Sequence, residues 1–319
     1  KSYRDVIVDF YSHGVERKIV PIEGISLQES TTLSVQKKIE EKLLTLTEDI
    51  ELSFEDDELY YKMGTGIFSA KLELDDSDSE DTDTVMTHAD DSTYYLMSIE
   101  YLRKDLKNFL VNTTDITTDN LEFINKPKKY NYRKELTLFN SEWVYKISFE
   151  PKEQGVFQGV MYIAAMNYAV LQFDYEFATG KSTENINLLG IGHKVNYKKA
   201  QIIYEKVDTA YFVKYVNAEK REFFSIDRNF FMVKKKNRFL FDKALNKIKF
   251  ALDMQFETKN GWELLVIHRQ NLTKEVFEGI EEPKKMAIKK ELVYSPDMWE
   301  HGSVIVPNTE LKNFRRGVE

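Results

Sequence analysis

An acidic stretch in the first third of the chain holds the densest set of possible metal ligands. Residues 75–84 read DDSDSEDTDT, and the candidate ligands in this stretch are Asp76, Asp78, Glu80, Asp81 and Asp83. Carboxylate oxygens are the ligands that Ca²⁺ prefers. A helix–loop–helix calcium site also needs a central glycine and a bidentate glutamate at the end of its loop, and neither is present here. The stretch therefore predicts a solvated acidic loop, with a calcium site as the weaker alternative.

The five histidines are the other candidates for metal binding or proton transfer: His13, His88, His193, His268 and His301. None of them has a second histidine three to five residues away, so the chain has no local zinc motif, although distant ligands could still come together in the fold. The chain has no cysteine. This excludes disulfides, thiolate zinc sites, iron–sulfur clusters and thiol nucleophiles. We predict no metal site outside the acidic stretch and no cofactor.

Motifs for phosphate binding and nucleophilic catalysis are also missing. Gly190 and Gly192 lie in LLGIGHKV, where no strand leads into a helix, so their spacing predicts a loop and not a phosphate cradle. No GxxxxGK[ST] segment exists, and the residues after Ser26 do not form a nucleophile elbow. We therefore predict no catalytic residues, and the sequence favours a protein without enzymatic activity.

The composition is that of a chain with a large core. It has 319 residues, 42% of them hydrophobic, with 18 Tyr and 21 Phe. This excludes disorder over most of the chain. The net charge of −8 argues against nucleic acid as a partner. No apolar run is long enough to predict a membrane span.

Alternating apolar and polar residues dominate the pattern. In EWVYKISFE (142–150), Trp143, Tyr145, Ile147 and Phe149 share one face, and the stretches 169–177 and 247–257 alternate in the same way. Antiparallel strands with one buried face have this pattern. The sequence therefore predicts a mainly β (α+β) fold. We expect a curved, antiparallel open sheet or half-barrel of about ten strands with a few helices on its concave face.

Helical spacing of apolar residues predicts helices at 33–44, at 98–111 and at 3–12. No linker rich in Pro, Gly or Ser divides the chain. We therefore predict a single β-rich domain over 1–319. Its acidic, helix-containing N-terminal part covers 1–115 and its main antiparallel sheet covers 130–307. A boundary near 115–130, where the sequence is polar, is the alternative.

Three stretches resemble one family of proteins. The early segment keeps Phe10 and Tyr11, and the closing segment keeps Pro296, Trp299, Ile305 and Pro307. The densest match is a hairpin formed by Tyr145, Ile147, Phe149, Pro151, Phe157, Gly159, Tyr162, Ile163, Ala169 and Val170. Together they resemble the uncharacterised β-rich domain of Bacteroidetes cell-envelope proteins that carry a carboxypeptidase-regulatory-like sandwich. The hairpin is also similar in fold to periplasmic lipoprotein-carrier half-barrels, which hold acyl chains.

The resemblance implies a periplasmic or outer-membrane-associated location and brings no catalytic residues with it. We expect a non-enzymatic envelope protein that binds an apolar (lipid or acyl), glycan-linked or protein ligand. The alternative is a hydrolase of envelope peptide or glycan that uses dispersed His and carboxylate residues. The chain begins at Lys1 in a segment that already resembles ordered structure. We therefore expect a processed or truncated product, and we leave open whether an N-terminal anchor precedes it.

If the sheet is a carrier, alternation assigns the ligand-facing side chains. The predicted apolar ligand-binding residues are Leu171, Phe173, Tyr175, Phe250, Leu252 and Met254. The alternative is that they fill an ordinary core, which the large number of Phe and Tyr residues favours.

Overall fold

The computed structural model describes most of the chain. The described residues are 2–14, 16–28, 59–66, 68–72, 94–116, 119–236, 243–291, 293–301, 305 and 309–312. The predicted helix at 33–44 and the acidic stretch with Asp76, Asp78, Glu80, Asp81 and Asp83 lie outside the described residues.

The chain divides into two compact units, each built from separate parts of the sequence. Unit 1 contains residues 1–105, 231–249 and 270–319, and unit 2 contains residues 106–230 and 250–269. These limits differ from the predicted parts 1–115 and 130–307. The reason is that the long strands β12 (Ala210–Lys236) and β13 (Lys243–Leu265) each contribute residues to both units.

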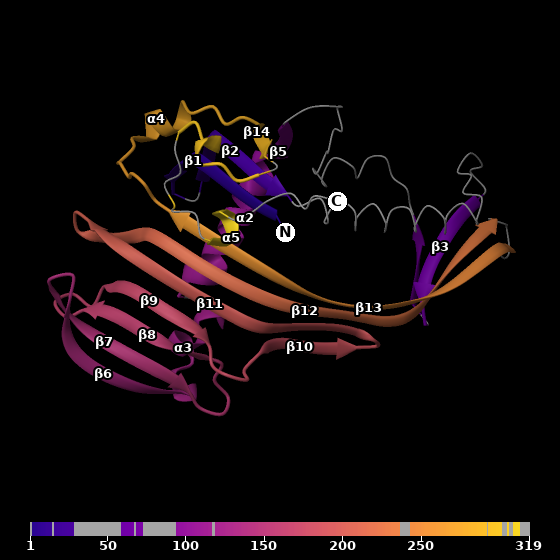
Figure 1. Cartoon of the computed structure of the whole chain (residues 1–319), viewed down its shortest axis with the longest axis horizontal. Helices are drawn as coiled ribbons and strands as arrows, with labels where there is room; N and C mark the ends of the chain where they lie inside the picture. Colours follow the sequence, from indigo (N-terminus) through magenta and orange to yellow (C-terminus); the bar gives the residue numbers. More distant parts are fainter. Residues whose placement is uncertain are drawn as a thin grey trace. The chain divides into compact units, whose positions relative to one another are not determined.

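A ten-stranded sheet contains most of the strands (Figure 1). Its main path runs in the order β4-β3-β12-β11-β9-β8-β7-β6, with β10 paired to β11 and β13 paired to β12. The remaining members are β3 (Leu59–Thr65), β4 (Phe68–Leu72), β6 (Tyr130–Phe139), β7 (Glu142–Pro151), β8 (Phe157–Ala164), β9 (Val170–Phe177), β10 (Thr183–Leu188) and β11 (Ile191–Val207). Their resolved registers are antiparallel, which confirms the predicted mainly β fold with an open sheet of about ten strands.

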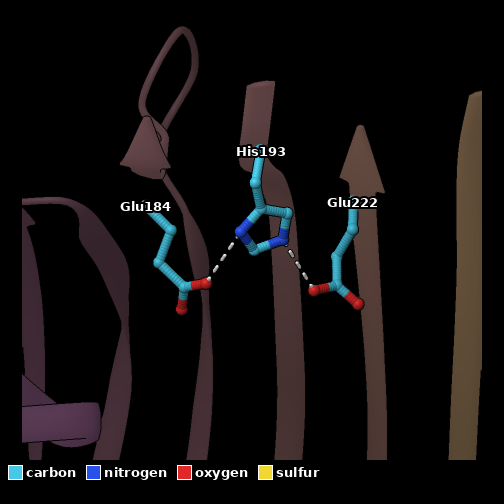
Figure 2. A group of neighbouring side chains, drawn as sticks. All are labelled: Glu184, His193 and Glu222. Carbon is cyan, nitrogen blue, oxygen red and sulfur yellow. Dashed lines mark hydrogen bonds and ion pairs between the residues drawn. The ribbon is translucent and has the colours of Figure 1, made fainter. Parts of the chain in front are cut away.

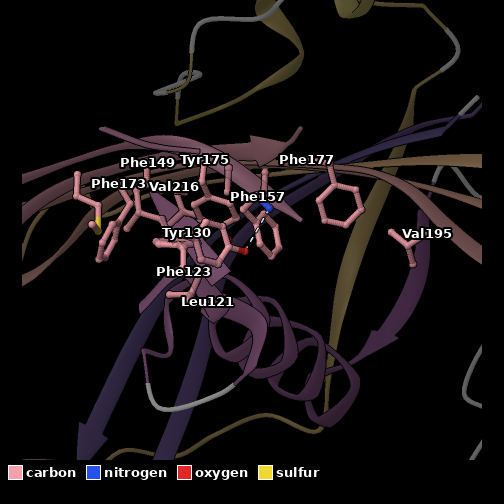
Figure 3. Close-up of a cluster of buried hydrophobic side chains, with 14 residues drawn as sticks. Leu121, Phe123, Tyr130, Phe149, Phe157, Phe173, Tyr175, Phe177, Val195 and Val216 are labelled. Atoms are coloured by element: carbon pink, nitrogen blue, oxygen red, sulfur yellow. Dashed lines mark hydrogen bonds between the residues drawn. The ribbon is translucent and has the colours of Figure 1, made fainter. Parts of the chain in front are cut away.

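The core of unit 2 lies on one face of this sheet (Figure 3). Side chains from β6, β7, β8, β9, β11 and β12 form it, because alternate residues of each strand point to this face. A short helical segment covers them; it consists of η2 (Asp119–Leu121), α3 (Glu122–Asn125) and η3 (Pro127–Lys129). Phe123 of α3 is 1% exposed and stacks on Phe149, with ring centroids 4.3 Å apart.

A buried polar network holds this covering segment in place. The Glu122 carboxylate accepts hydrogen bonds from the Tyr130 hydroxyl, from Lys129 Nζ at 3.0 Å and from the Val156 backbone N–H at 3.0 Å. The Tyr130 hydroxyl also accepts from the Val156 and Phe157 backbone N–H groups. Burial, followed by the bond to Glu122, raises the pKa of Tyr130, so this phenol stays protonated and satisfies the buried carboxylate.

The helix α2 (Ile99–Thr114) confirms the helix predicted at 98–111. Its second half belongs to unit 2 and packs near the core of the sheet. The Tyr175 hydroxyl donates to the Thr113 carbonyl at 3.2 Å, and Phe109 stacks on Trp262 of β13.

Unit 1 contains a four-stranded sheet in the order β1-β2-β14-β5. Its strands are β1 (Ser2–His13), β2 (Glu16–Gln28), β14 (Lys285–Glu291) and β5 (Tyr94–Ser98), and the β14–β2 pair is parallel. Unit 1 also holds the short helices α4 (Lys274–Glu278), η4 (Pro296–Met298) and α5 (Thr309–Lys312). Ile19, Met286 and Ile288 are buried in one cluster, and Trp299 packs with Ile25 and Leu27 in another.

The helix predicted at 3–12 is wrong, because these residues form β1. The apolar pairs Val6–Ile7 and Phe10–Tyr11 fit a helical stripe, but β-branched and aromatic residues also suit a strand. The segment pairs with β2 along its whole length, and Gly14 at φ +57° makes the turn between them. Among the described residues, no helix has the length and apolar character needed to cross a membrane.

Candidate functional site

The face of the sheet that carries the core continues beyond the core onto β6 and β7. In the β6–β7 register Tyr132 lies opposite Phe149, Leu136 opposite Tyr145, and Leu138 opposite Trp143. Residues two apart in a strand point to the same face. Trp143 and Tyr145 therefore share a face with the buried Phe149, as the alternation predicted.

This continuation is exposed. Leu136 is 58% exposed, Leu138 is 59% exposed and Trp143 is 55% exposed. Tyr168, in the turn between β8 and β9, is 72% exposed and stacks on Tyr145 with ring centroids 6.3 Å apart. We call these five residues the β6–β7 apolar patch: Leu136, Leu138, Trp143, Tyr145 and Tyr168.

The turn that carries Tyr168 is fixed by backbone hydrogen bonds. The Ala165 N–H donates to the Trp143 carbonyl at 2.9 Å, and the Tyr168 N–H donates to the Ala164 carbonyl at 2.9 Å. Tyr168 has φ +59°, a conformation that is uncommon for a residue with a side chain. The turn thus holds a large aromatic side chain at the surface in a defined position.

The patch lies at a sheet edge. Among the described strands, β6 pairs with β7 alone and is the last strand of the main path, so its other edge has no strand beside it (Figure 1). Such an edge offers unpaired backbone N–H and C=O groups to another chain. Next to the patch, the ammonium of Lys134 lies 4.8 Å from the centre of the Tyr145 ring.

The opposite face of the same strands is packed. Val144 and Ala164 are 0% exposed and form a small cluster with Leu171, against which Phe139 and Tyr162 pack. The β6–β7 hairpin therefore has a hydrophobic anchor of its own that does not use the β6–β7 apolar patch.

A second feature of unit 2 is a polar cluster across three strands (Figure 2). The imidazole of His193 on β11 lies between two carboxylates. Its Nδ1 is 3.5 Å from Glu184 Oε2 of β10, and its Nε2 is 3.2 Å from Glu222 Oε1 of β12. We call these three residues the His193 cluster.

Strand register brings the His193 cluster together. His193 pairs with Phe224, and Val195 pairs with Glu222. Because Glu222 is two residues from Phe224 on β12, it lies on the same face of the sheet as His193. Glu184 lies where the β10–β11 register shifts and has φ +52°. A β-bulge of this kind re-aims a side chain, and here the Glu184 carboxylate faces the imidazole.

Two lysines border the His193 cluster. Lys220 Nζ lies 2.8 Å from Glu222 Oε1. Burial raises the pKa of Glu222, but hydrogen bonds from Lys220 and His193 outweigh burial and leave this pKa below its usual value. Lys198 pairs with Lys220 across the strands and donates to the Asn112 carbonyl at 2.9 Å. Burial, and then the charge of Lys220, lower the pKa of Lys198 to about 8.

A cavity of about 420 Å³ lies at the end of β9 and is not apolar. Its lining includes Glu176, Lys181, Lys194 and Asn196, together with Phe177 and Tyr197. An acyl chain needs an apolar cavity. This lining, with charges of both signs, does not provide one, and neither His193 nor its two carboxylates belong to it.

The structure does not bring the six predicted ligand-binding residues to one place. Phe173 and Tyr175 are 1% and 2% exposed and lie inside the core of unit 2. Leu171 packs with Val144 instead, because the β8–β9 register shifts beside it. On β13, Phe250 stacks on Phe230, Leu252 is half-buried and Met254 is 37% exposed. None of the six lines the 420 Å³ cavity.

No protein-family model matches the chain, and no curated protein or solved structure matches it either. The resemblance to Bacteroidetes envelope proteins therefore stays a prediction.

Proposed function

We propose that the chain is a non-enzymatic binding protein whose β6–β7 apolar patch recognises a protein ligand. The observation that carries this proposal is the exposure of Leu136, Leu138, Trp143 and Tyr168 on the face that elsewhere forms the core. Location in the cell envelope, periplasmic or associated with the outer membrane, belongs to the same proposal and rests on the sequence resemblance alone.

The energetic argument starts from the cost of exposed apolar surface. Burying a large apolar side chain completely stabilises a complex by about 1.5–3 kcal/mol. Four such side chains on one face therefore offer a binding partner several kcal/mol before the cost of association is subtracted. Trp and Tyr are also the residues that most often dominate protein interfaces.

A protein ligand suits the patch better than a lipid or a glycan does. An acyl chain needs an enclosed apolar cavity, whereas this face lies at the surface of the sheet. A glycan presents hydroxyl groups, and Leu136 and Leu138 offer them no hydrogen bonds. An extended peptide can pair with the edge of β6 that no described strand covers, while its side chains cover the patch, which is the strand-addition mode of recognition.

A hydrolase is the second candidate, because the His193 cluster places an imidazole between two carboxylates. General acid–base catalysis also needs a bound substrate within reach of these groups. The described cavity does not include the His193 cluster in its lining, so we rank binding above hydrolysis. Hydrolysis of an envelope peptide or glycan by the intact protein, lost in His193→Ala, would reverse this order.

A displayed library of random peptides of about 12 residues tests the binding proposal. The library is selected against the intact protein, and the affinity of a selected peptide is then measured for two matched variants. Leu138→Lys places a charge in the patch. Leu188→Lys makes the same change at a 66% exposed leucine of β10, outside the patch.

We expect Leu138→Lys to weaken peptide binding at least tenfold and Leu188→Lys to leave it unchanged, with similar thermal midpoints for both variants. Equal affinities for the two variants, or the failure to select any peptide, would contradict the proposal.

A further inference from the structure

We propose that the His193 cluster binds a divalent transition-metal ion such as Zn²⁺. His193 Nε2 and the Glu222 carboxylate supply the ligand atoms, and Glu184 orients the imidazole. This inference concerns β10, β11 and β12 and does not depend on the proposed peptide-binding function.

The donor atoms already lie at suitable separations. The His193 nitrogen atoms are 3.5 Å and 3.2 Å from the two carboxylate oxygens, and one ligand atom from each of the three residues lies within 4.8 Å of the others. Zinc takes imidazole nitrogen and carboxylate oxygen at about 2.0–2.2 Å, so two of its ligands stand roughly 3.3 Å apart in a tetrahedral site. The separation of 3.2 Å between Nε2 and Glu222 Oε1 matches this spacing.

In this proposal Glu222 supplies a ligand atom, whereas Glu184 orients the imidazole. It faces Nδ1, the nitrogen atom on the other side of the ring. A metal ion that binds Nε2 replaces the proton which Nε2 donates to Glu222, and a carboxylate facing Nδ1 then holds the remaining proton of the imidazole on Nδ1. This arrangement of carboxylate, histidine and metal is the usual way in which a histidine ligand is oriented.

Packing fixes the plane of the imidazole. The His193 ring stacks on Phe224 with centroids 4.6 Å apart, and Phe224 stacks on Phe256 of β13 at 5.2 Å. This stack of three rings extends over the strands β11, β12 and β13 and holds the imidazole in one orientation. Since a preformed ligand loses less conformational entropy on binding, this stack favours metal binding.

Lys220 is the internal competitor for the metal. Its ammonium lies 2.8 Å from Glu222 Oε1, the same oxygen that faces His193. A metal ion must displace this ammonium, which then remains close to Lys198, its partner across the strands. Two protein ligands and a competing cation make the affinity for Zn²⁺ modest and leave coordination positions open for water or for a carboxylate of a ligand.

Titration calorimetry of the intact protein with ZnCl₂ near pH 7.5 tests the inference. We expect one equivalent of Zn²⁺ to bind, with at least tenfold weaker binding in His193→Ala and in Glu222→Gln. Glu184→Gln should weaken binding by about tenfold, as expected for a residue that orients a ligand. His268→Ala removes an exposed histidine far along the chain and is the matched control, for which we expect no change.

Lys220→Met provides the most specific result, because its effect has the opposite sign. Removing the competing ammonium should strengthen Zn²⁺ binding severalfold, whereas a cluster that serves only as an ion-pair network would show no such gain. A long-range ¹H–¹⁵N spectrum of the imidazoles should also identify His193 Nε2 as the coordinated atom. Absence of Zn²⁺ binding up to millimolar concentration, or binding that His193→Ala and Lys220→Met leave unchanged, would overturn the proposal.

Discussion

The two ends of strand β7 share one alternating sequence pattern, but the side chains at one end are buried and those at the other end are exposed. At one end Phe149 is 1% exposed beneath Phe123 of the covering segment η2–α3–η3, and at the other end Trp143 is 55% exposed. Both side chains belong to the same alternating series and point to the same face. The difference is caused by the covering segment, which reaches Phe149 and leaves Trp143 at the surface. The apolar face that the covering segment leaves exposed is the surface that we propose as the binding site.

The largest effect that tests this comparison is expected when one aromatic side chain, that of Phe123 or of Trp143, is replaced by alanine. Phe123→Ala removes the centre of the covering segment and should lower the free energy of unfolding by roughly 3–5 kcal/mol, as expected for a buried phenylalanine. Trp143→Ala should lower it by less than about 1 kcal/mol, because the exposed side chain loses little packing. Urea unfolding measures both, and equal losses would show that the two ends of β7 do not differ.

A smaller effect is expected from the polar network under the covering segment. Glu122→Ala removes the acceptor of the buried Tyr130 hydroxyl and leaves the Val156 N–H with the Tyr130 hydroxyl oxygen as its remaining acceptor. We expect a loss of about 1–3 kcal/mol. Glu135→Ala on β6 is the control, because that carboxylate is exposed and pairs only with the exposed Arg133 among the described contacts. Similar losses for both variants would contradict the role given to the network.

The third test uses pH at Lys198, where the covered core meets the His193 cluster. Its pKa in the folded chain is about 8, against an ordinary value of 10.5. Between these two values the unfolded chain binds more protons than the folded chain, so this lysine makes the free energy of unfolding rise with pH. Comparison with Lys198→Met isolates the contribution, since both proteins share all other titrating groups. We expect a steeper rise between pH 8 and pH 10.5 in the wild type, and identical slopes would contradict the assignment.

The sequence predicts the strands of unit 2 well and the two candidate sites poorly. Alternation in EWVYKISFE identifies the apolar face of β7. The exposure of Trp143, however, depends on how far the covering segment with Phe123 extends over the sheet, and no local sequence pattern encodes that extent. The His193 cluster joins residues 184, 193 and 222 through strand register and a β-bulge, so spacing rules for zinc motifs do not detect it. Helix and strand compete at 3–12 because both patterns fit, and pairing with β2 decides the outcome.

The central claim is that the uncovered end of β6 and β7 binds a protein ligand. Hydrogen–deuterium exchange of the intact protein, with and without a selected peptide, tests it most directly. We predict that the peptide slows exchange of amides in β6, at the free edge of the sheet, and that this protection disappears in Leu138→Lys. Protection confined to other strands, with exchange in 130–139 unchanged by the peptide, would contradict the claim.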